Sequence, residues 1–283
     1  MKIQTNNKKK QITNNGNGNP EPIVGKRGAS IARVLLSLGS AFLLSFSSVA
    51  FGAAEKPAIV LVHGAFVDGS SWQRVIPILQ RDGYLVTAVQ NPLTSLPDDI
   101  ATTKRVVDAQ KGPVVVVGHS YGGAVITGAA EGNSNVKALV YVAAFAPEAG
   151  EPLGDPGKKF AEPPLNSAIA PDAGGFLYID RAGFHDVFCK DLSEADARVL
   201  VATQKPLNGS VFGASVDTAT WKTIPSWYIV SSQDRAENPD AQRFYAKRMG
   251  AKTTEITGAS HLSPLSHPKE VAKVIEDAAQ ASQ

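Results

Sequence analysis

Short apolar runs alternate with amphipathic segments along most of the chain. The runs are five to seven residues long, and most are rich in valine, isoleucine and alanine. Such runs are typical of strands buried on both faces of a parallel sheet. They predict six strands, at residues 58–62, 84–90, 114–118, 138–144, 226–232 and 253–257.

The segments between these strands have the spacing of helices. In one of them Ile100, Thr103 and Val107 share a face. Helices are predicted at residues 71–81, 98–111, 121–131, 239–249 and 268–279. Alternating strands and helices predict an α/β fold, with a mostly parallel six-stranded sheet and helices on both of its faces.

One long segment, roughly residues 146–222, interrupts the alternation after the fourth strand. It contains proline- and glycine-rich loops and the sequence of two or three short helices. A segment of this length is rarely a plain loop. We therefore expect a small cap inserted over the carboxyl ends of the strands, where open α/β sheets bind ligands.

Residues 1–54 have the character of a leader that precedes a folded domain at 55–283. A polar stretch rich in Asn and Lys is followed by three basic residues and then by 21 uncharged residues, 34–54. This order is typical of a bacterial signal peptide, which predicts a periplasmic or secreted protein that meets the membrane only during export. An uncleaved signal anchor is the alternative, because 21 residues can span a bilayer.

The leader also explains the charge of the chain. The formal net charge is +2, but the leader holds seven of the 28 Lys and Arg and one of the 26 Asp and Glu, which leaves −4 for the rest. A negative domain gives no reason to expect nucleic acid as a partner. The single cysteine, Cys189, cannot form an intramolecular disulfide, which is compatible with export.

The most specific motif is Gly118-His119-Ser120-Tyr121-Gly122, a G-x-S-x-G between the third strand and a small-residue helix. A tight turn in this position exposes a serine nucleophile. A dinucleotide fingerprint is the competing interpretation, but a serine stands where its second glycine would be needed. We therefore expect Ser120 to be the nucleophile.

A serine nucleophile needs a histidine base that is oriented by a carboxylate. For this turn the chain order is serine, acid, histidine. His261 follows the last strand and is favoured over His267, which begins the final helix. Asp234 follows the fifth strand and is favoured over Glu148, which lies in the loop after the fourth strand.

Acyl transfer also requires N–H donors directed at the developing oxyanion. The backbone N–H of Tyr121, directly after the nucleophile, is one predicted donor. The other is the N–H of Ala65, in the turn His63-Gly64-Ala65-Phe66 after the first strand. We expect His63 to anchor this loop by hydrogen bonding and not to act as a base.

These motifs resemble the α/β-hydrolase superfamily over nearly all of the chain after the leader. VLVHGAF, SSQDRAENPDAQRFYAKRMGA and GASHLSPLSHP are similar to the small-esterase branch, in its bacterial form, that is related to plant methylesterases and hydroxynitrile lyases. The resemblance implies Ser120, Asp234 and His261 as a triad, Ala65 and Tyr121 as oxyanion donors, and carboxylester hydrolysis without a cofactor or a metal.

Two positions distinguish the esterases of this branch from the lyases. The lyases typically have Thr after the histidine of the first loop and Lys after the catalytic histidine. This chain has Gly64 and Leu262 at these positions, which argues against lyase chemistry.

The predicted function is hydrolysis of a small or medium carboxylic ester through an acyl-enzyme on Ser120. Aromatic residues of the cap suggest an apolar pocket. The expected substrate-binding residues are Phe66, Phe184, Phe188 and Leu262. No metal site is expected, since His185 and Cys189 lack a third ligand nearby. Two alternatives are a ligand-binding protein without hydrolytic activity and a cofactor-free lyase or perhydrolase on the same site.

Overall fold

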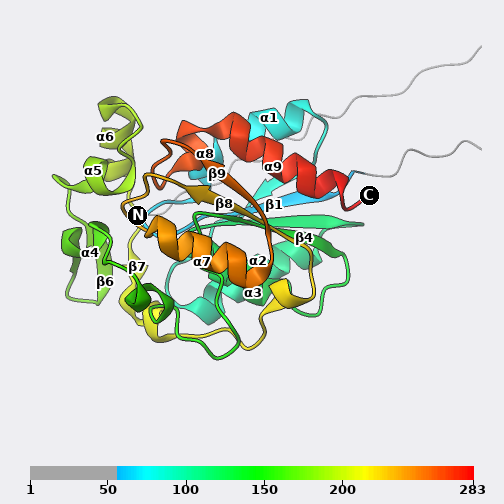
Figure 1. The fold of residues 1–283 in the computed structure, drawn as a ribbon, viewed down its shortest axis with the longest axis horizontal. Helices are drawn as coiled ribbons and strands as arrows, with labels where there is room; N and C mark the ends of the chain where they lie inside the picture. The colour runs from blue at the N-terminus through cyan, green and yellow to red at the C-terminus, as the bar shows by residue number, and fades with distance from the viewer. Residues whose placement is uncertain (1–55) are drawn as a thin grey trace, which may run out of the picture. The chain divides into compact units, whose positions relative to one another are not determined.

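The six predicted strands form one parallel sheet in a computed structural model that describes residues 56–283 (Figure 1). Their order across the sheet is β2-β1-β3-β4-β8-β9, and every neighbouring pair is parallel. The strands are β1 (Ala58–Val62), β2 (Val86–Ala88), β3 (Val114–His119), β4 (Val136–Val142), β8 (Ser226–Ser231) and β9 (Lys252–Ile256).

Helices cover both faces of the sheet. The side chains of β1 alternate between two cores, with Ile59 and Leu61 on one face and Val60 and Val62 on the other. On the first face lie α1 (Ile76–Arg81) and α9 (Pro268–Gln280), and on the second lie α2 (Leu96–Asp108), α3 (Gly122–Ala129) and α7 (Pro239–Met249) (Figure 1). The predicted α/β architecture is therefore confirmed.

Two predicted elements are shorter than their sequence pattern suggests. The helix predicted at 71–81 is broken into a 3-10 turn, η1 (Gly69–Trp72), and α1, because Pro77 lacks an N–H and fits only in the first turn of a helix. The strand predicted at 84–90 contains only Val86–Ala88, since β2 lies at the sheet edge and pairs with β1 alone.

The sequence predicts two or three short helices in the segment between β4 and β8, and the structure has three. They are α4 (Leu165–Ala168), α5 (Phe184–Phe188) and α6 (Glu194–Ala202), with 3-10 turns η2 (Pro156–Lys159), η3 (Gly209–Gly213) and η4 (Thr220–Lys222). The segment also contains a three-stranded antiparallel sheet that the sequence analysis missed. Its strands are β5 (Ile169–Pro171), β6 (Phe176–Ile179) and β7 (Leu207–Asn208), in the order β5-β6-β7. Strands of two to four residues are too short to show a periodic pattern.

The predicted leader lies outside the described residues, so its cleavage or anchoring stays a prediction. Within residues 56–283, no helix is both long enough and apolar enough to span a bilayer.

Candidate active site

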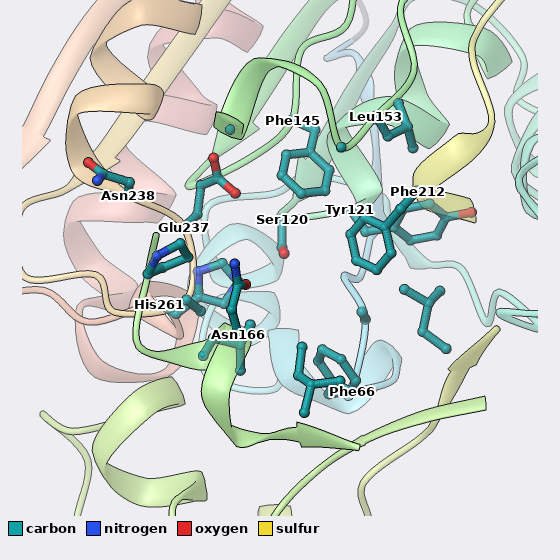
Figure 2. Close-up of a pocket in the computed structure, with 18 of the residues that line it drawn as sticks. Phe66, Ser120, Tyr121, Phe145, Leu153, Asn166, Phe212, Glu237, Asn238 and His261 are labelled. Atoms are coloured by element: carbon teal, nitrogen blue, oxygen red, sulfur yellow. The ribbon is translucent and has the colours of Figure 1, made fainter. Parts of the chain in front are cut away.

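Ser120 lies in the sharp turn between β3 and α3. Its φ is 54°, in the left-handed region that is strained for a residue with a Cβ. Glycines make the turn possible: a Cβ on Gly118 would lie 2.5 Å from the carbonyl oxygen of Gly122, and a Cβ on Gly122 would lie 2.7 Å from that of Val62. The turn presents the Ser120 side chain to a cavity (Figure 2).

His261 and Asp234 form a buried hydrogen-bonded pair. The Nδ1–H of His261 donates to Asp234 Oδ2 at 2.7 Å. Gln242 Nε2 donates to the same oxygen at 2.8 Å, and the backbone N–H groups of Ala236 and Glu237 donate to Oδ1 at 2.8 and 2.9 Å. Four donors thus fix the carboxylate, which in turn fixes the tautomer and orientation of the imidazole.

Ser120 and His261 border the same cavity (Figure 2). Within residues 56–283 no hydrogen bond joins Ser120 Oγ to the imidazole. Contacts of this kind are often long in a free enzyme and shorten when substrate binds. The structure therefore places Ser120 and His261 at one cavity, and Asp234 is hydrogen-bonded to His261 without lining that cavity.

His119 supports the loop that carries His261. Its Nε2–H donates to the backbone carbonyl of His261 at 2.9 Å, and the two ring centroids are 4.8 Å apart. Burial holds the pKa of His119 well below its usual range, so this imidazole is neutral at neutral pH. His119 therefore makes a positioning contact with the loop that carries His261.

The two predicted oxyanion donors are available at the cavity. Within the described part of the chain, the N–H groups of Ala65 and Tyr121 have no protein acceptor. His63 holds the first loop: its Nδ1–H donates to Gly64 O at 2.8 Å, and its Nε2 accepts from Asn91 N–H at 3.0 Å. These bonds agree with the anchoring role that we expected for His63.

The cavity has a volume of about 320 Å³ and a mostly apolar lining. Five aromatic residues border it with Ser120, namely Phe66, Tyr121, Phe145, Phe188 and Phe212. All of them except Phe188 are labelled in Figure 2. Two of the expected substrate contacts are thus placed at the cavity, and two are not. Phe184 is fully buried behind Phe188, with ring centroids 5.2 Å apart, and Leu262 points into the core.

The alternative acid and base make other contacts. Glu148 pairs with Lys222, and His267 Nδ1 lies 3.5 Å from Asp191.

Burial raises the pKa of the Cys189 thiol to about 12, so it is not a reactive thiolate. No group of three His, Cys, Asp or Glu residues within 56–283 could hold a metal ion.

Glu237 and Gln242 were not predicted as site residues. Gln242 is fully buried and holds Asp234, and Glu237 lines the cavity although it is only 8% exposed. Both follow Asp234 within eight residues, and this closeness in the sequence is the one signal that could have predicted them as site residues. Polar residues at the start of a helix otherwise suggest a solvated surface.

The model of the alpha/beta hydrolase family matches residues 59–274. The chain belongs to the alpha/beta hydrolase family. The enzyme class and the fold expected from the motifs are confirmed by this match.

Two curated relatives of this hydrolase are matched over nearly their whole length. A probable hydrolase, R7, from a Phoma species is 28% identical, covering 79% of this chain and 98% of the relative. Polyneuridine aldehyde esterase from Rauvolfia serpentina is 26% identical, covering 81% and 97%. The crystal structure of polyneuridine aldehyde esterase superposes with a TM-score of 0.69 at 20% identity, covering 79% of this chain and 99% of that one. The structural match supports the same fold.

Proposed function

We propose that this hydrolase is a serine esterase that cleaves small or medium carboxylic esters through an acyl-enzyme on Ser120. One observation carries the proposal: a strained serine at φ 54° shares a cavity with a histidine whose Nδ1 lies 2.7 Å from a buried carboxylate. The names of the relatives agree with an ester-hydrolysing enzyme.

In the proposed mechanism Ser120 Oγ attacks the ester carbonyl carbon while His261 Nε2 takes the hydroxyl proton. The carbonyl oxygen becomes an oxyanion that accepts from the N–H groups of Ala65 and Tyr121. The C–O bond to the alcohol then breaks, and His261 returns the proton to the departing alkoxide. Water, deprotonated by His261, hydrolyses the acyl-enzyme and restores Ser120.

The cavity supports a substrate of modest size. Its volume of about 320 Å³ is at the lower end of ordinary ligand pockets, which hold about 300–1,000 Å³. Its aromatic lining favours apolar acyl or alcohol groups. The Asp234 carboxylate would stabilise the imidazolium that forms during attack.

A fluorophosphonate probe tests the assignment of the nucleophile. We expect one phosphonyl group on Ser120, located by peptide mass spectrometry, and turnover of 4-nitrophenyl butanoate by the same preparation. The matched control, Ser120→Ala, should remain unlabelled. An unlabelled wild-type protein that binds esters without cleaving them would support the ligand-binding alternative, and a product other than acid plus alcohol would support the lyase or perhydrolase alternative.

We also propose that residues 1–54 direct export. Support comes from the basic, apolar and small-residue order of this segment. Expression of the full chain in a Gram-negative host should place the enzyme in the periplasm or medium, with a new N-terminus near residue 55. A full-length product in the membrane fraction would instead indicate an uncleaved anchor.

Gly64 is expected to be essential for the position of the nucleophile. A Cβ at this residue would lie 2.7 Å from Ser120 Cβ and 3.0 Å from His119 O. Gly64→Ala should therefore displace the turn and lower kcat about 100-fold, since small misplacements of reacting groups cost about that much. Threonine, which the related lyases have here, would be larger still. Gly213→Ala is the matched control, because a Cβ there meets nothing within 4 Å. Equal kcat values for the two variants would contradict this expectation.

Asp191 connects the cap to the loop that carries His261. Its carboxylate accepts from the backbone N–H of Ser260 at 2.9 Å and from the Ser260 hydroxyl. Asp191→Ala should lower the free energy of unfolding by about 2 kcal/mol, the usual range for hydrogen bonds to a charged group. Urea unfolding measures this change. Asp217→Ala, at an exposed cap position, is the control, and a loss no greater than that of the control would show that the contact is not stabilising.

A further inference from the structure

Glu237 is a buried carboxyl group that the proposed mechanism does not use. It lies in the loop between β8 and α7, where its backbone is held on both sides: its N–H donates to Asp234 Oδ1 at 2.9 Å, and its carbonyl accepts from Gln242 Nε2 at 3.0 Å. The Glu237 side chain takes no part in these backbone bonds. It extends from the loop into the cavity that Ser120 borders (Figure 2).

The Glu237 carboxyl has no partner in the described protein. Within residues 56–283, no hydrogen bond or ion pair reaches its side-chain oxygens, although the residue is only 8% exposed. A buried polar group without a partner is costly, and such groups in native proteins usually meet a ligand or a water. The carboxyl borders the cavity, so a molecule bound there can contact it.

The surroundings favour the neutral acid over the carboxylate. Burial and the nearby negative charge of Asp234 raise the pKa of Glu237 well above its usual range. The phenols near it, Tyr228 and Tyr245, also carry no charge at neutral pH, and burial raises their pKa values further. A neutral carboxylic acid supplies one O–H donor.

We propose that Glu237 is a specificity-determining residue that donates a hydrogen bond to a second oxygen of the substrate, apart from the ester group that is cleaved. This inference rests on the proposed esterase function and narrows its substrate class to esters that carry a ketone, ether or hydroxyl oxygen. A site that offers a buried donor discriminates against analogues that lack the acceptor, because the donor is then left unpaired.

Matched ester pairs test the proposal. In each pair one methylene is replaced by an ether oxygen or a carbonyl: 4-nitrophenyl hexanoate against 3-ethoxypropanoate, 4-nitrophenyl pentanoate against 4-oxopentanoate, and butyl butanoate against 2-methoxyethyl butanoate. The kcat/KM ratio of each pair is divided by the ratio for hydroxide-catalysed hydrolysis, which removes intrinsic reactivity. We expect the wild type to favour the oxygen-bearing member of at least one pair about 10-fold, as one hydrogen bond allows.

Variants of Glu237 distinguish the effect of its O–H donor on the kcat/KM ratio from the effect of its side-chain volume. Glu237→Leu should bring the ratio close to one, and Glu237→Gln should retain part of it, because an amide N–H also donates. Glu162→Gln is the matched control, since Glu162 also borders the cavity but is exposed, and it should keep the wild-type ratio. A ratio near one for every pair in the wild type, or an unchanged ratio in Glu237→Leu, would overturn the proposal.

Two further measurements do not depend on turnover. Calorimetric Kd values of the same pairs for Ser120→Ala should show the same preference, even if the chain proves to bind esters without cleaving them. The infrared spectrum at pH 7 should contain the C=O stretch of a protonated carboxylic acid that disappears in Glu237→Gln. Absence of that band, or a preference for 4-nitrophenyl 5-(trimethylammonio)pentanoate with its fixed positive charge, would indicate an ionised carboxylate and overturn the proposal. Loss of all labelling at Ser120 would contradict the esterase function alone.

Discussion

Replacement of Asp234 by asparagine is expected to lower kcat about 10⁴-fold, the loss typical of a triad whose acid becomes an amide. Oδ2 of Asp234 accepts from both His261 Nδ1 and Gln242 Nε2. An amide N–H in that place would face the ring nitrogen as a donor and would move the imidazole proton to Nε2. His261 could then no longer accept the proton of Ser120, although the fold would be nearly unchanged.

The measurement is kcat for 4-nitrophenyl butanoate, with circular dichroism and urea unfolding to show that the variant is folded. Asp240→Asn is a suitable control, because Asp240 lies on α7 nearby but is exposed and pairs only with Arg243 among the described residues. Asp234→Asn with more than a tenth of wild-type kcat would mean that another group orients His261.

A second large effect is expected on stability in acid. His63 is buried as a neutral imidazole, and burial lowers its pKa from 6.5 to about 4. Between these values the unfolded chain binds a proton at His63 that the folded chain does not bind. Stability is therefore complete above about pH 6.5 and falls as the pH falls towards 4, by about 3 kcal/mol for this one group. His119 is shifted in the same direction by burial and adds to the loss.

Urea unfolding at a series of pH values between 7 and 4 measures this dependence. His63→Gln should be less stable than the wild type at pH 7, because two buried hydrogen bonds are disturbed. Its free energy of unfolding should nevertheless fall less steeply with acid, since no imidazole remains at that position. Parallel curves for the two proteins would show that His63 does not contribute to the acid sensitivity.

Elements with a strong local signal could be predicted from the sequence. The run at residues 114–117 is apolar without interruption and predicts the buried strand β3, and the G-x-S-x-G after it predicts the turn that carries Ser120. Asp234 and His261 were predicted to lie near Ser120 because parallel strands end at one edge of the sheet, where their following loops meet. In each case the decisive information lies within a few residues.

What the sequence did not predict depends on contacts between distant segments. The strands β5, β6 and β7 are two to four residues long and are stabilised by pairing with one another, which no local pattern records. Phe184 and Phe188 lie one turn apart on α5, and only packing against Phe66 and His261 places Phe188 at the cavity. Likewise, Asp234 Oδ1 accepts hydrogen bonds from the backbone N–H groups of Ala236 and Glu237, and these bonds fix the backbone from which the Glu237 side chain extends.

In the segment from Asp234 to Gln242, the backbone and the side chain of residue 237 have different roles. Asp234 is held by the backbone N–H of residue 237 and not by its side chain. Any amino acid except proline can supply that N–H, so position 237 can change its side chain while the triad acid keeps its bonds. Substrate preference in this hydrolase can therefore diverge by single substitutions at residue 237 without loss of the catalytic arrangement.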